Sequence, residues 1–146
     1  LTMHSVERSV LVLHSASQMF DLVADVEKYP QFMPWCGGAN VSAQDEHGMQ
    51  ASITISLAGI KQTFTTRNKH LYSSCIELEL VDGPFSALTG KWEFIALSED
   101  ACKVLFTLNY QFSNRTLETL VGPIFNRIAS SFIDSFTQRA QVCYGE

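Results

Sequence analysis

The spacing of apolar residues changes along this chain and divides it into a mixed start, a long β-rich middle and a helical end. Residues 6–13 have the apolar-rich, extended pattern of a first strand. Ser15 and Gln18 form the capping box of a helix that should end at Tyr29-Pro30, since the residue before proline avoids helical geometry. A second short helical turn is expected before Pro34.

The middle of the chain alternates apolar and polar residues with a period of two, which is typical of strands with one wet face. A strand is expected from Ala39, and the clearest alternation lies in residues 51–57, 61–71, 76–80, 88–97 and 104–112. Turns between these strands are expected at Gly59 and at the segments 82–84 and 98–100. The pattern therefore predicts an antiparallel sheet of six or seven strands.

The end of the chain predicts one long amphipathic helix from Asn114 to about Gln141, with a kink at Gly122-Pro123. Its apolar stripe is wide and must pack on the sheet. We expect an α+β fold in a single domain, residues 1–146: a curved antiparallel sheet wrapped around the last helix, with two short helices after the first strand. Such a sheet often leaves a hydrophobic cavity beneath its helix, which makes small-molecule binding the first functional idea.

Composition narrows the classes of function. The chain is 46% hydrophobic and 17% charged, with a formal net charge of −5, as expected of a folded acidic protein. Net negative charge opposes binding to a phosphate backbone, so DNA is not an expected partner. There is no apolar run long enough to span a bilayer and no signal-peptide core. The four cysteines form no C-x-x-C pair, which favours reduced thiols in the cytoplasm over disulfides.

The candidate ligand tunnel is the set of apolar residues expected to face inward from the strands and the last helix. An apolar, concave lining suits a lipophilic ligand, although a solid core would show the same pattern. Its members are Phe64, Leu78, Leu80, Trp92, Phe94, Phe106, Leu108, Tyr110, Phe125, Ile128, Phe132 and Phe136.

The segment 29–36 places aromatic residues and two prolines between the helices and the sheet. It is interpreted either as a lid or surface that contacts a membrane or partner, or as a buried plug. Together with the turn at residues 82–85 it supplies the expected tunnel mouth. The mouth residues are Tyr29, Phe32, Trp35, Asp82 and Phe85.

The segment 61–69 predicts a strand with a polar outer face. Lys61, Thr63, Thr65, Arg67 and Lys69 share one parity, whereas Phe64 has the opposite parity and should point inward. A row of cations and hydroxyls on an outer face suits phosphate groups, and an ordinary solvated strand face is the alternative.

Signals for catalysis and metal binding are weak. No Ser-His-Asp order, paired carboxylates or phosphate-binding glycine loop is found, and no histidine has metal-ligand spacing from a cysteine. Asp82 is the one carboxylate placed near the expected mouth, and it is equally explained as a turn residue before Gly83-Pro84.

Residues 6–9, 29–36, 61–68 and 81–85, with Trp92 and Phe94, resemble a known family in the same order along nearly the whole chain. They are similar to the ribosome association toxin (RatA) and coenzyme Q-binding branches of the START-like (SRPBCC), polyketide cyclase-related superfamily. The resemblance implies a helix-grip fold with a lipophilic tunnel. One branch implies ubiquinone binding in support of respiration, and the other implies binding to the large ribosomal subunit and blocking of subunit association. Neither role is enzymatic.

Three hypotheses follow. The first is a non-enzymatic protein that binds ubiquinone or a similar polyprenyl lipid without a required cofactor, in the cytoplasm or peripheral to the inner membrane with transient membrane contact. The second is a ribosome-binding toxin that uses Lys61, Arg67 and Lys69 as its contact surface. The third is a small-molecule cyclase or hydrolase that depends on Asp82.

Overall fold

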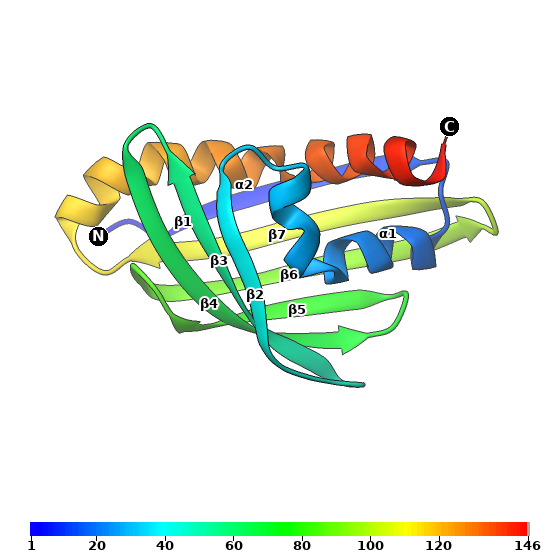
Figure 1. Ribbon diagram of the computed structural model, residues 1–146, viewed down its shortest axis with the longest axis horizontal. Helices are drawn as coiled ribbons and strands as arrows, with labels where there is room; N and C mark the ends of the chain where they lie inside the picture. The colour runs from blue at the N-terminus through cyan, green and yellow to red at the C-terminus, as the bar shows by residue number, and fades with distance from the viewer. Residues whose placement is uncertain (146) are drawn as a thin grey trace.

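Seven strands form one antiparallel sheet in the computed structural model, which describes residues 1–145 (Figure 1). The elements are β1 (His4–Val12), α1 (Ala16–Ala24), the 3-10 helix η1 (Val26–Gln31), β2 (Cys36–Asp45), β3 (Gly48–Leu57), β4 (Ile60–Leu71), β5 (Cys75–Asp82), β6 (Phe85–Ser98), β7 (Ala101–Phe112) and α2 (Arg115–Tyr144). The expected sheet with two short helices and a long last helix is confirmed.

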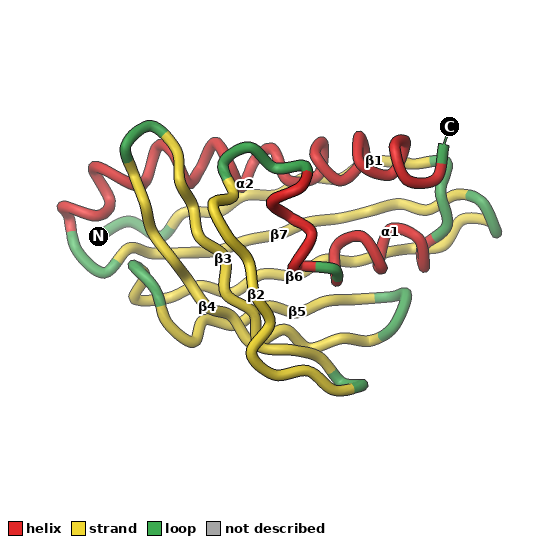
Figure 2. The backbone as a smooth tube through the Cα atoms, in the orientation of Figure 1, coloured by secondary structure: helices red, strands yellow, loops and turns green. Residues whose placement is uncertain are grey.

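Strands β2 to β7 form a meander, and the first strand, β1, pairs with β7 at one edge of the sheet. Its spatial order is β1-β7-β6-β5-β4-β3-β2, so each strand from β2 to β7 pairs with its neighbour in sequence. The sheet curls strongly, and β2, β3 and β4 run steeply across the direction of β1 and β7 (Figures 1 and 2). The curl leaves a concave inner face toward α2, α1 and η1.

Both predicted helix starts are confirmed by their capping bonds. The Ser15 hydroxyl accepts the Gln18 N–H at 3.1 Å, and the Gln18 side chain accepts the Ser15 N–H at 2.9 Å. The Asn114 side chain accepts the Leu117 N–H at 2.9 Å at the start of α2. Each cap satisfies an amide group that has no partner within its helix.

The end of the first helix was predicted wrongly. Helix α1 stops at Ala24, because Asp25 adopts non-helical angles (φ −84°, ψ 65°), and residues 26–31 form the separate 3-10 helix η1. Tyr29 and Pro30 therefore lie within η1 instead of ending α1. Within η1, the Tyr29 ring packs 5.3 Å from the Phe136 ring of α2, measured between centroids.

The long helix α2 packs its apolar stripe against β1, β7 and α1. It spans 30 residues and stays helical through Gly122 and Pro123, the position of the predicted kink. Its buried face consists of Val121, Phe125, Ile128, Ala129, Ile133, Phe136 and Ala140. Within residues 1–145, no helix combines the length and apolar character needed to cross a membrane.

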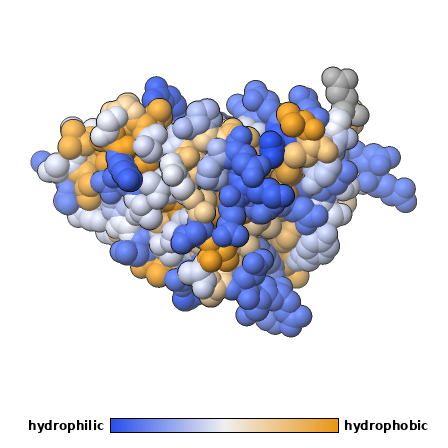
Figure 3. All heavy atoms as spheres, in the orientation of Figure 1, coloured by the Kyte–Doolittle hydropathy of each residue, from blue (hydrophilic) through white to orange (hydrophobic). Residues whose placement is uncertain are grey.

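Aromatic rings fill the space between the sheet and α2. Phe85 lies 4.9 Å from Phe125, and Trp92 lies 4.4 Å from Phe106, measured between ring centroids. By contrast, the surface in Figure 3 is mostly polar, and its apolar patches are separated from one another by polar residues. The four cysteines are free thiols, and Cys36 and Cys102 are buried.

Candidate functional site

An interior cavity lies between the inner face of the sheet, α2 and the α1–η1 segment. Its volume is about 50 Å³. That is room for about one or two water molecules, whereas pockets for organic ligands hold about 300–1,000 Å³. The interior is thus largely filled by side chains, and a lipid can enter only if α2 or the α1–η1 segment moves outward.

The structure brings most of the predicted tunnel residues to this cavity. Those that line it are Phe64, Leu78, Trp92, Phe106, Leu108, Phe125, Phe132 and Phe136. Leu80, Phe94, Tyr110 and Ile128 belong to the surrounding core and not to the lining. Val23, Ala24, Val26, Ile53, Ile76 and Leu88 complete the apolar lining.

The predicted mouth residues do not form one opening. Tyr29 lines the cavity from η1, and Trp35 is buried with its ring 5.5 Å from Phe132. Phe85 is likewise buried, and Phe32 is half-buried against Phe136 at 5.7 Å. The segment 29–36 is therefore a cover whose aromatic side chains face the core, which is the plug interpretation. Asp82 is exposed, and its carboxylate accepts the Gly83 N–H at 2.9 Å, as a turn residue does.

Three polar side chains on the inner face of β4 reach the cavity and were missed. Thr66, Asn68 and His70 share the parity of Phe64, so they follow it along the inward side of the strand. Parity was the signal that could have found them, because Phe64 was already placed inward. Their importance lies in their surroundings, since every other residue of the lining except Tyr29 is apolar.

The inner row, defined as Thr66, Asn68 and His70, is only partly satisfied within the protein. The Thr66 hydroxyl donates to the Asn68 side-chain oxygen at 2.6 Å. In contrast, the His70 Nε2 is buried without a hydrogen-bond partner, and it is the one such side-chain atom among residues 1–145. Burial lowers the pKa of His70 below its ordinary value, which favours the neutral ring. A neutral imidazole still has a donor or an acceptor to offer at Nε2.

Two side chains fasten the cover, residues 29–36, to the helices. The Tyr29 hydroxyl donates to the Val23 carbonyl, and burial raises the pKa of Tyr29 well above its ordinary range. The Arg139 guanidinium lies 4.9 Å from the centre of the Phe32 ring and donates to the Gln31 side chain at 3.2 Å. The cover is thus joined to α1 through Tyr29 and to α2 through Arg139.

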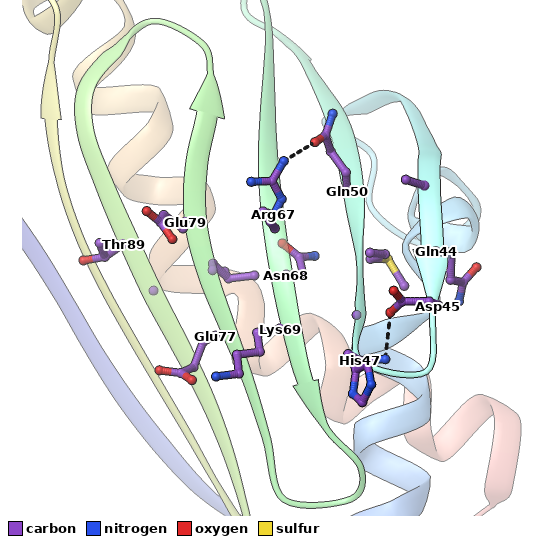
Figure 4. A pocket seen from close by; sticks show the side chains of 15 residues that line it. Gln44, Asp45, His47, Gln50, Arg67, Asn68, Lys69, Glu77, Glu79 and Thr89 are labelled. Atoms are coloured by element: carbon purple, nitrogen blue, oxygen red, sulfur yellow. Dashed lines mark hydrogen bonds between the residues drawn. The ribbon is translucent and has the colours of Figure 1, made fainter.

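A second concavity, the outer groove, lies on the opposite face of the sheet (Figure 4) and has a volume of about 760 Å³. It holds Arg67 and Lys69, two of the three cations predicted to contact a ribosome. Lys61 is exposed on the same strand but does not line the groove. The remaining lining is Ala43, Gln44, Asp45, His47, Gly48, Met49, Gln50, Asn68, Glu77, Leu78, Glu79, Thr89 and Gly90.

The charge of the outer groove is mixed. The register of β4 and β5 places Arg67 opposite Glu79 and Lys69 opposite Glu77. Arg67 also donates to the Gln50 side chain at 3.0 Å. The predicted outward parity is confirmed, since Arg67 and Lys69 are exposed while Phe64 is buried. The carboxylates temper the positive potential that the strand sequence alone suggests.

The chemistry available at the interior cavity is limited to a few polar groups. Within residues 1–145, no group of three or more metal-ligating side chains lies close enough together to hold a metal ion. The interior contains one imidazole and no carboxylate among its lining residues. The cavity can therefore bind apolar surface and exchange hydrogen bonds along the inner row.

Comparisons with known proteins agree on fold and family. The family model for polyketide cyclase/dehydrase and lipid transport matches residues 12–137. The ribosome association toxin RatA of Vibrio cholerae is 48% identical, over 99% of this chain and all of the relative. A mitochondrial coenzyme Q-binding protein homologue of Xenopus laevis is 23% identical, over 90% of this chain and 55% of the relative.

The solved structures share the architecture. The Zhui aromatase/cyclase of Streptomyces sp. R1128 superposes with a TM-score of 0.83 over 98% of each chain, at 15% sequence identity. This likeness establishes the START-like, helix-grip fold that the sequence resemblance implied. At that identity it carries no information about activity.

Proposed function

We propose that this chain, which belongs to the polyketide cyclase/dehydrase and lipid transport family and within it to the RatA proteins, acts as a ribosome association toxin. The observation that carries the proposal is the 48% identity to the Vibrio cholerae RatA protein, which extends over 99% of this chain and the whole relative. A match of that length includes both faces of the sheet and the long helix. The proposed partner is the large ribosomal subunit, whose occupation would block joining of the small one.

The test is a subunit-joining assay. Purified small and large subunits are mixed with and without the protein, and joined ribosomes are measured by sucrose-gradient sedimentation. We expect the joined fraction to fall and the protein to sediment with the large subunit. An unchanged profile at saturating protein would overturn the proposal.

The proposed contact surface is the outer groove together with Lys61, which lies at the start of β4. Reversal of both Arg67 and Lys69 to Glu should weaken binding and flatten its salt dependence, because fewer counterions are released. The matched control reverses Lys28 and Lys103, which lie outside the groove and give the same change in net charge. Equal loss of binding in both variants would indicate a general charge effect and reject this surface.

A second candidate function is binding of a polyprenyl quinone or a similar lipid in the interior cavity. Two observations favour it: the polar inner row within an apolar lining, and the coenzyme Q-binding relative. Burial of an isoprenoid tail is favourable by about 25 cal/mol per Å² of apolar surface, which opposes the cost of moving the cover. The lipid would occupy the interior and the ribosome the outer groove on the opposite face of the sheet, so the two functions are compatible, although Asn68 and Leu78 line both concavities.

Organic extraction of natively purified protein, followed by mass spectrometry, tests the second candidate. A stoichiometric quinone would support it, and protein that stays empty when quinone is offered would reject it. Phe132→Asp places a charge in the lining and should abolish quinone retention while the variant stays folded. If that variant still retained quinone, the quinone site would not include Phe132.

Both candidate functions are non-enzymatic. The cyclase or hydrolase hypothesis was built on Asp82, which lies at an exposed turn. Turnover of a small molecule that disappears in Asp82→Asn would favour that alternative.

A further inference from the structure

Buried polar side chains are rare in this protein, and their positions are informative. Among residues 1–145, only His14, Thr66 and Asn68 are buried polar residues, and the latter two are inner-row neighbours on β4. Burying polar groups opposes folding unless they are fully hydrogen-bonded. An apolar pair would fill the same positions at less cost, so the row needs an explanation other than core stability.

The hydrogen-bonding groups that the row presents define the ligand chemistry. The Thr66 proton is used by the Asn68 oxygen, so the Asn68 amide group offers its NH₂ donors to any further partner. His70 adds Nε2, which has no partner and can carry a hydrogen in the neutral ring. Two donors on one strand, about 6.6 Å apart along it by strand geometry, suit a ligand with acceptor oxygens.

The surroundings of His70 place this end of the row beneath the first helix. The Phe20 ring of α1 meets the His70 ring edge-on, with centroids 5.5 Å apart. Val23 and Ala24 at the end of α1 also line the cavity. A ring bound at His70 would therefore be covered by α1, with the aromatic side chains of α2 left for an apolar tail.

We propose that the inner row of Thr66, Asn68 and His70 is a recognition site for the carbonyl oxygens of a ketone-bearing ring, such as a quinone. Asn68 and His70 donate to the oxygens, and Thr66 orients Asn68. This inference rests on the second candidate function, interior lipid binding, and specifies which end of the ligand β4 recognises. In this proposal the inner row selects ligands that carry carbonyl oxygens, and the apolar lining provides most of the binding affinity.

The experiment compares two probes of similar shape, menadione (2-methyl-1,4-naphthoquinone) and 2-methylnaphthalene, which lacks the oxygens. Because menadione adds covalently to free thiols, every sample carries Cys75→Ser and Cys143→Ser, which replace the two cysteines that are not buried. Binding is measured by isothermal titration calorimetry, and the His70 ring signals are followed by NMR. We expect menadione to bind about tenfold more tightly, as two modest hydrogen bonds would give, and to shift the His70 signals. Equal affinity of the two probes would overturn the proposal while leaving interior binding intact. Binding of neither probe would overturn interior ligand binding itself.

The decisive variants are apolar isosteres. Thr66→Val with Asn68→Leu should keep the affinity for 2-methylnaphthalene, remove most of the preference for menadione, and leave thermal stability equal or higher. His70→Phe should reduce the preference separately. The matched control is Thr63→Val, on the outer face of the same strand, which should preserve the preference. A row that serves only stability would instead show lower melting temperatures and an unchanged preference.

Discussion

The Tyr29 hydroxyl donates a hydrogen bond to the Val23 carbonyl and thereby joins η1 to the last turn of α1. The last carbonyls of a helix have no partner within it, so this bond satisfies one of them in a buried place. The same tyrosine ring lies 5.3 Å from Phe136 of α2. One residue thus connects both helices that cover the concave face.

Tyr29→Phe should lower the free energy of unfolding by about 1–3 kcal/mol, because it leaves the buried Val23 carbonyl without a donor. Urea denaturation measures this loss. Tyr72→Phe, at a side chain that is 64% exposed, is the control and should change stability by less than about 0.5 kcal/mol. Equal effects of the two changes would show that the bond to Val23 adds nothing.

Arg139→Ala should loosen the cover without unfolding the protein. Its guanidinium packs on Phe32 and donates to Gln31, and an exposed cation–π contact contributes about 0.5–1 kcal/mol. Amide hydrogen exchange in residues 26–31 should therefore quicken about two- to fivefold. Arg127→Ala, at an exposed position of α2, provides the comparison. Faster exchange over the whole chain would contradict a local role.

Phe106→Leu and Phe112→Leu form a matched pair, since both rings are fully buried but only Phe106 lines the cavity. Each change should cost roughly 1–3 kcal/mol of stability through lost packing. Only Phe106→Leu should alter the affinity for 2-methylnaphthalene, because it alone changes the lining. Calorimetric titration of both variants measures this, and similar changes in affinity would argue against the interior site.

The pH dependence of stability should include a contribution from Glu118. Its carboxylate accepts a hydrogen bond from the His4 ring at 3.0 Å, which holds the pKa of Glu118 below its ordinary value of 4.5. A carboxyl whose pKa is lowered by folding stabilises the protein above its unfolded pKa, and this contribution fades as the pH falls through the folded value.

Glu118→Gln tests that contribution. The wild type should be more stable than Glu118→Gln at pH 6, and the difference in urea midpoint should shrink when the pH falls below about 4.5. Glu99→Gln, at an exposed position in the turn between β6 and β7, is the control. A difference that persists unchanged at pH 3 would mean that the His4 bond does not depend on the ionised carboxylate.

Local sequence patterns are enough to place the elements in order. Ser15 and Asn114 mark helix starts through bonds to residues three positions away, and the alternation around Phe64 separates an inner from an outer strand face. These features depend on residues close together in the chain, so a pattern is enough to find them. The limit of such signals appears at Ala24, where the helix ends before Tyr29-Pro30 because the following turn packs beneath α2.

The shape and filling of the interior follow from long-range packing. The curl of the sheet and the position of α2 leave about 50 Å³ where the apolar pattern suggested a tunnel, and they bury Trp35 and Phe85 in the core. Strand register sets Arg67 beside Glu79, and the packing of α1 on the sheet sets Phe20 against His70. These outcomes depend on contacts between residues far apart in the chain. Periodicity shows which face of a strand or helix a side chain occupies, but its contacts on that face depend on the packed fold.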